Sequence, residues 1–249
     1  MQFTAITLSE MRRIWMQPLV WIVLGITFII LALLFLVLLN NFYAEIQVKF
    51  AGVANAPGVT DSVFSPMFFW SAIIGALMMP LFTMRIITEE KVRHQFTLLS
   101  SAPISCRLIT SSKMLALISI IIVFAILNLL FPVAIMSFVD LDWGKIFAAI
   151  CGVILFQISF TAICLWLAAC TQNLIFSVLS SFTVLFLLFV LFISGASAED
   201  SSLFSYLSSF SHLLPSLSGL IAGQDVIYFV VITVLFLSLT VIRLRFKRE

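Results

Sequence analysis

The chain has 249 residues, of which 63% are hydrophobic and 10% are charged, and its formal net charge is +2. Soluble domains average about 45–50% apolar and about 25% charged residues, so this chain has more apolar residues than one core of its size can bury. The composition excludes an ordinary soluble domain and predicts a protein that lipid solvates.

Six apolar segments are long enough to cross a bilayer as helices, which takes roughly 20 mainly apolar residues each. Their apolar runs do not alternate with polar residues as strands of a membrane barrel do. We therefore predict an all-α membrane protein with one transmembrane domain over residues 1–249. The expected spans are residues 19–39, 67–84, 114–138, 146–169, 174–193 and 226–242.

Residues 1–18 precede the first span and are amphipathic. Their apolar residues share one helical face, at Ala5, Leu8, Met11 and Trp15. Pro18 lies where a helix would bend. The pattern favours an N-terminal helix lying at the membrane interface over a plain extension of the first span.

Residues 86–101, between the second and third spans, form a second amphipathic segment. Phe96 and Leu99 are spaced for one helical face, while Glu89 and Glu90 suit the first turn of a helix. Pro103 would end this helix. From periodicity alone, the helix could equally rest on lipid or dock onto a partner.

Residues 197–224, before the last span, are rich in serine yet carry several leucines and phenylalanines. Pro215 and Gly219 interrupt the segment, and it is too short to span. We expect short re-entrant or interfacial helices here.

Charge distribution predicts the orientation. If the six spans alternate, one side collects 11 of the 13 basic residues and the other side holds only Lys49 and Lys145. Cytoplasmic segments carry the excess of Lys and Arg. Both termini and residues 86–101 are therefore expected in the cytoplasm.

The sequence lacks recognisable catalytic motifs. It has no phosphate-binding loop, no HExxH motif and no zinc-ligand cysteine spacing, and its four cysteines are expected to be buried, inert thiols. No Asp, Glu, Lys or Arg falls at the centre of a span, which argues against ion-coupled transport. The polar residues within spans are expected to form interhelical hydrogen bonds rather than to contact a substrate; they are Asn128, Gln157, Ser159, Thr161 and Thr183.

The segment 85–113 reads RIITEEKVRHQFTLLSSAPISCRLITSSK and resembles the start of the cytoplasmic loop in export-type ABC transporter permeases. His94 and Gln95 stand where that pattern has a Gly-Thr pair. The residues that match the pattern are Glu89, Glu90, Leu98, Leu99, Ser101, Pro103, Ser105 and Lys113. The C-terminal part, 206–244, is similar to the end of the gliding-motility, GldF-like branch of that superfamily. Its matches include Ser208, His212, Gly219, Asp225 and Tyr228.

The resemblance implies a type V ABC transporter fold in a bacterial inner membrane. It implies a dimer, either of two copies of this chain or of one copy and a paralogue, that carries two ATP-binding subunits. ATP and Mg would be bound by those subunits, so this chain would hold no cofactor and would not itself be an enzyme. No nucleic acid partner is implied, and membrane lipid surrounds the spans.

The resemblance also assigns candidate site residues. Residues 89–101 would be the coupling helix that docks in a groove of the ATPase. Its docking residues would be Glu89, Glu90, Arg93, Phe96 and Leu99. An extracytoplasmic partner surface would include Ser208, His212 and Gly219.

Two functions follow from this resemblance. The chain could be a permease subunit that couples ATP hydrolysis by its partner to export or extraction of a substrate. Alternatively, it could be a mechanical transmitter that uses ATP to move an extracytoplasmic partner without transport. An apolar seam without a cavity between the paired copies would favour the transmitter.

Single cysteines introduced into a variant without the native cysteines test the orientation. We expect labelling from outside at Phe50, Leu141 and Ser205, and only from inside at Arg93 and Lys247, because of the asymmetric charges. Labelling of position 93 from outside would contradict both the orientation and the coupling helix.

Overall fold

The computed structural model describes residues 2–46, 58–88, 105–197 and 206–246. Within these ranges the chain is helical and contains no strand. Six helices are long and apolar enough to cross a membrane. The predictions of an all-α chain and of six membrane-length helices are therefore confirmed.

The described elements follow one another along the chain as a series of helices. They are α1 (Gln2–Trp15), α2 (Pro18–Asn41), η1 (Phe42–Ile46), η2 (Thr60–Phe64), α4 (Ser65–Thr83), η3 (Met84–Thr88), α7 (Cys106–Ile135), α8 (Trp143–Cys170), α9 (Leu174–Ser197), α11 (Ser209–Leu217) and α12 (Gly223–Phe246). The short segments η1, η2 and η3 are single π-helical turns, and η2 and η3 extend α4 into one helix over Thr60–Thr88.

The break between α1 and α2 falls at the predicted place. Gln17 has an extended backbone, with φ −80° and ψ 127°, and Pro18 is the first residue of α2. Proline suits this first position because its missing N–H would have no partner in the helix. Trp21 Nε1 donates to the carbonyl oxygen of Trp15 across the break, at 3.0 Å.

The third span begins earlier than predicted, at Cys106 rather than at Met114. Ser105 caps this helix, because its Oγ accepts a hydrogen bond from the backbone N–H of Leu108 at 3.4 Å. Hydropathy alone places the start of the third span at its first apolar run, and it misses the two polar helical turns that precede this run. Consequently Lys113 lies inside α7.

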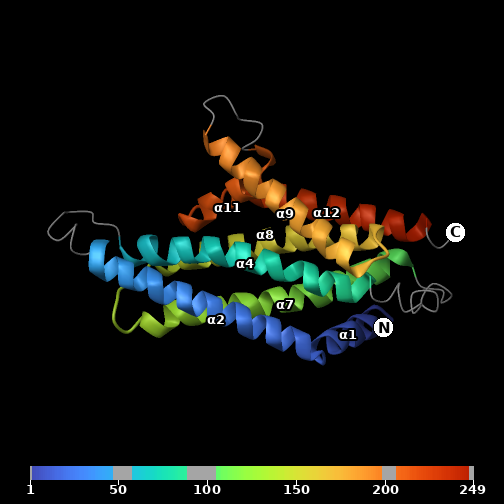
Figure 1. Ribbon diagram of the computed structural model, residues 1–249, viewed down its shortest axis with the longest axis horizontal. Coiled ribbons are helices and arrows are strands. Elements are labelled where there is room, and N and C mark those ends of the chain that lie inside the picture. The colour runs from blue at the N-terminus through green and yellow to red at the C-terminus, as the bar shows by residue number, and fades with distance from the viewer. Residues whose placement is uncertain (1, 47–57, 89–104, 198–205, 247–249) are drawn as a thin grey trace.

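Helix α8 is the central element. It packs against α4, α7, α11 and α12, and it is the most buried of the six long helices. In Figure 1, α2, α4, α7, α8 and α12 run along the length of the molecule. Helix α9 is inclined to them and lies with α11 above them in this view. The last turn of α12 and helix α1 lie at the same end.

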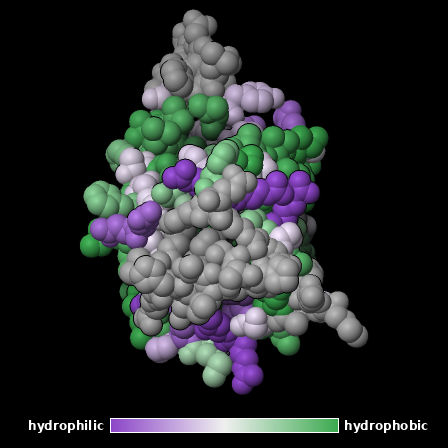
Figure 2. Space-filling model, turned by 90° about the vertical axis from the view of Figure 1, so that its right-hand side faces the viewer, coloured by the Kyte–Doolittle hydropathy of each residue, from purple (hydrophilic) through white to green (hydrophobic). Residues whose placement is uncertain are grey.

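Charged groups gather at the two ends of the bundle. Figure 2 shows hydrophilic side chains on the end that holds α1, with hydrophobic side chains on its flanks. At the opposite end, Lys145 Nζ donates to Asp61 Oδ1 and Oδ2 at 2.8 and 2.9 Å. This distribution is the one expected of a bundle that spans a membrane along its length.

Much of the phenylalanine content builds the interior. Phe210 of α11 is fully buried and contacts rings from three other helices. Their centroids lie 4.9–6.0 Å away, in Phe69, Phe156, Phe189 and Phe192. These aromatic contacts attach α11 to α4, α8 and α9.

The expectation of interhelical hydrogen bonds from polar residues within spans is wrong for four of the five. Asn128, Ser159, Thr161 and Thr183 each donate to a carbonyl three or four residues earlier in their own helix. A short polar side chain reaches that oxygen without any neighbouring helix. The buried Gln157 amide has no hydrogen-bond partner among the described residues.

Gly152 lets α11 lie close to α8. A Cβ built there would overlap Ser216, whereas a Cβ on Gly25 of α2 would meet nothing within 4 Å. We expect Gly152→Ala to lower the free energy of unfolding by about 1–3 kcal/mol, because the site is already filled.

The matched control is Gly25→Ala, which should be neutral or stabilising by up to about 1 kcal/mol, because alanine favours a helix. Unfolding in detergent measures both. Equal effects at the two positions would contradict close packing at Gly152.

Candidate functional site

A buried lysine joins three helical segments at the end of the bundle that holds α1. The side chain of Lys113 is only 2% exposed. Its Nζ donates to Glu10 Oε1 of α1 at 3.0 Å and to the carbonyl oxygen of Ile86 in η3 at 3.1 Å. We call Glu10, Lys113 and Ile86 the Lys113 clamp.

The chemistry of these groups explains why they lie together. A buried ammonium ion is costly unless an opposite charge and hydrogen bonds compensate for the lost water. Lys113 gains both from Glu10 and the Ile86 carbonyl oxygen. Glu10 Oε2 lies 4.0 Å from Arg13 Nη1, so the carboxylate is also close to a second cation.

Along the sequence, two residues of the clamp flank the predicted coupling helix. Ile86 is near the end of the second span, just before residue 89, and Lys113 is two turns into the third span. The predicted docking residues lie between them, outside the described residues; they are Glu89, Glu90, Arg93, Phe96 and Leu99. ATPase docking by these residues stays a prediction.

Two further hydrogen bonds fix the surroundings of the clamp. Trp15 Nε1 of α1 donates to Ser119 Oγ of α7 at 3.0 Å. Thr88 Oγ1 donates to the carbonyl oxygen of Ala168 in α8 at 3.5 Å, a long bond. Helix α1 and the end of the second span are thus attached to α7 and α8.

The sequence analysis missed the clamp. It matched Lys113 to the pattern of the cytoplasmic loop and gave no role to Glu10, which lies 103 positions away in the chain. One signal was available: Lys and Glu are almost never fully buried unless they are paired. A lone acid and a lone lysine at the edges of apolar segments are therefore candidates for a pair.

The predicted extracytoplasmic residues lie around α11. Ser208 precedes the helix and its Oγ donates to the carbonyl oxygen of Leu188 in α9 at 3.3 Å. His212 is inside α11, and Gly219 turns the chain after it, with a φ of 92° that glycine adopts without strain. The structure therefore brings all three to one region.

His212 joins α11 to α12. Its Nδ1 lies 2.7 Å from Asp225 Oδ1, and its Nε2 lies 3.1 Å from the carbonyl oxygen of Tyr206. The imidazole stacks on the Tyr228 ring with centroids 3.9 Å apart. The Tyr228 hydroxyl in turn donates to the carbonyl oxygen of Leu207 at 2.9 Å. These contacts hold α11 in a fixed position.

The side chains of Ser208 and His212 are buried in the chain, at 0% and 9% exposure. They would therefore act on a partner by shaping this region rather than by touching the partner. The large apolar side chains that are exposed nearby are Tyr206, Leu207, Leu214, Leu220 and Ile221.

The described residues hold no group of three or more His, Cys, Asp or Glu side chains that could bind a metal ion. Cys106 and Cys164 are buried as expected, but Cys151 is exposed and Cys170 is partly exposed. The expectation that all four thiols are buried is wrong for Cys151, because it lies on an outward face of α8.

The chain matches no protein-family model and no curated protein sequence. The resemblance to ABC permeases stays a prediction that depends on the residues quoted above. Function has to be argued from the arrangement of the helices.

Variants of the clamp test whether the buried pair stabilises this end. Lys113→Met leaves the Glu10 carboxylate buried without its ammonium partner, and we expect a loss of about 3–5 kcal/mol in the free energy of unfolding. The double variant Glu10→Leu/Lys113→Met removes both charges at similar volume and should recover most of that loss. A double variant as unstable as the single one would show that pairing is not what Lys113 contributes.

Proposed function

We propose that this chain is the membrane subunit of an ATP-driven ABC transporter. It couples ATP hydrolysis by a separate ATP-binding subunit to export or extraction of a substrate across the bacterial inner membrane. Two copies, or one copy and a paralogue, assemble with two ATP-binding subunits on the cytoplasmic face, where both termini of this chain lie.

The observation that carries the proposal is the position of the Lys113 clamp. A force applied to residues 89–104 enters the second span at Thr88 and the third span at Ser105, because those residues are the points of attachment. Lys113 holds the two spans and α1 together close to these points, because it lies two turns after Ser105 and bonds to Ile86, two residues before Thr88. The three elements therefore respond to such a force as one unit.

The packing supports a route from this end to the opposite end. Helices α4 and α7 both pack against α8, which in turn packs against α11 and α12. Protein interiors are densely packed, so a displaced helix moves its neighbours rather than compressing them. Motion of the clamped unit would thus reach α11 through α8.

A second function, mechanical transmission without transport, is favoured by the exposed apolar surface around α11. Helices α9 and α11 lie to one side of the other long helices (Figure 1). Exposed side chains there include Tyr206, Leu207 and Ile221, while Phe210 and His212 hold α11 to its neighbours. A rigid, apolar surface suits contact with a partner protein. Uptake of substrate into inverted vesicles would support transport, and its absence with an active complex would support transmission.

Co-purification with the ATP-binding subunit tests the proposal. The purified chain alone should hydrolyse no ATP, and Phe96→Ala should weaken ATPase binding about 30-fold, because a buried aromatic anchor typically contributes 2 kcal/mol or more. Glu89→Lys/Glu90→Lys should slow docking by contact between like charges.

The matched control is Phe138→Ala, which removes an exposed phenyl ring at the opposite end of the bundle. It should leave ATPase binding unchanged. Full binding by both the Phe96 and the Glu89/Glu90 variants, at normal abundance in the membrane, would contradict docking through residues 89–101.

A further inference from the structure

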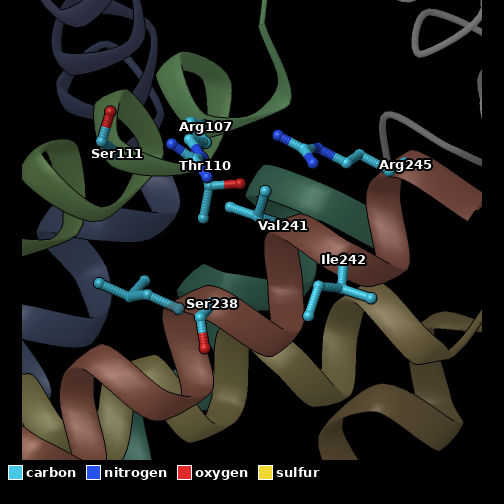
Figure 3. Close-up of a pocket in the computed structure, with 8 residues that line it drawn as sticks. Arg107, Thr110, Ser111, Ser238, Val241, Ile242 and Arg245 are labelled. Carbon is cyan, nitrogen blue, oxygen red and sulfur yellow. The ribbon is translucent and has the colours of Figure 1, made fainter.

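An open groove of about 380 Å³ lies between α7 and α12, at the end of the bundle that holds α1. Eight of the described residues line it (Figure 3): Arg107, Thr110 and Ser111 from α7, and Leu237, Ser238, Val241, Ile242 and Arg245 from α12. None of these lining residues is acidic. Glu10, Ile86 and Lys113 of the clamp are not among these lining residues.

Two arginines stand at the mouth of the groove. Arg107 is in the first turn of α7 and Arg245 is in the last turn of α12. Figure 3 shows the Arg245 side chain extending from α12 toward Arg107 on α7. Both are exposed, and neither guanidinium has a hydrogen bond or ion pair with another residue that the structure describes. Two cations without a counter-ion among the described residues favour an anionic ligand.

The rest of the groove offers apolar surface rather than free donors. The hydroxyls of Thr110, Ser111 and Ser238 each donate to a carbonyl of their own helix. The two guanidinium groups are therefore the hydrogen-bond donors that these lining residues offer to a ligand. Val241 and Leu237 lie one and two helical turns before Arg245, so apolar surface continues for about 12 Å away from the charges.

We propose that this groove binds an anionic phospholipid. The headgroup phosphate accepts hydrogen bonds from Arg107 and Arg245, whose planar guanidinium groups match phosphate oxygens two at a time. The first part of an acyl chain lies along Val241, Ile242 and Leu237.

The position of the groove favours a lipid over a free phosphate ion. The arginines stand at the ends of two membrane-length helices, which is where headgroups lie. Basic pockets between helices at this depth bind anionic headgroups. A free phosphate ion would use the two arginines but leave the apolar floor uncovered.

The chain offers a matched control for charge. Arg243 is two residues from Arg245 on α12, but it lines a separate groove with Ala169, Cys170 and Gln172. Arg243→Gln and Arg245→Gln remove the same charge from the same helix, and only the second changes the proposed site.

Native mass spectrometry of the full-length, detergent-purified protein tests the proposal. The probes are phosphatidylglycerol, phosphatidylcholine and inorganic phosphate. We expect retention of phosphatidylglycerol over phosphatidylcholine, and about 30-fold weaker binding in Arg107→Gln/Arg245→Gln, or roughly fivefold for each cation. Arg243→Gln should stay within about twofold of the unmodified protein.

A second variant separates the groove from its charges. Ser238 is exposed, so Ser238→Trp should fold normally while filling the groove and leaving both arginines in place; it should also lose phosphatidylglycerol. Three results would overturn the proposal: equal retention of phosphatidylcholine, an equal loss in Arg243→Gln, or complete displacement of the lipid by millimolar phosphate. The first would indicate an apolar groove only, the second general surface charge, and the third a site for a free anion.

Discussion

The burial of one ammonium group constrains the whole end of the molecule at which the chain begins. Lys113 lies inside a membrane-length helix with almost no exposed surface. Its charge is tolerable there only if Glu10 and the Ile86 carbonyl remain within hydrogen-bond distance. That requirement sets the position of α1 against α7 and of the second span against the third. Any movement of one of these elements alone would expose an unpaired charge to an apolar interior.

At the opposite end of the bundle, aromatic packing and one polar contact, rather than a buried lysine, fix the position of a helix. There, α11 is too short to span, and its position depends on an aromatic cluster around Phe210 and on the contact between His212 and Asp225. Helix α8 packs against elements of both ends. The two ends are thus joined through one central helix, which is the physical route that the proposed function requires.

Local features of the sequence predicted the helices well. The six spans follow from the lengths of apolar runs, and the break before α2 follows from the fixed backbone of Pro18. The start of α7 was misplaced because its first two turns are polar. The pairing of Glu10 with Lys113 was missed because it joins residues far apart in the chain, and no periodicity records such a contact. The hydroxyls in the spans were assigned to neighbouring helices because the closer carbonyls of their own helices were not considered.

We propose that α1, the second span and the third span move as one unit when ATP acts on the complex. Spin labels at Leu8 of α1 and Leu115 of α7, both exposed, test it by distance measurements between electron spins in the complex with the ATP-binding subunit. We predict that the Leu8–Leu115 distance within one copy is the same with and without trapped ATP, while the distance between the Leu8 positions of the two copies changes. A Leu8–Leu115 distance that changes as much as the distance between the copies would contradict it.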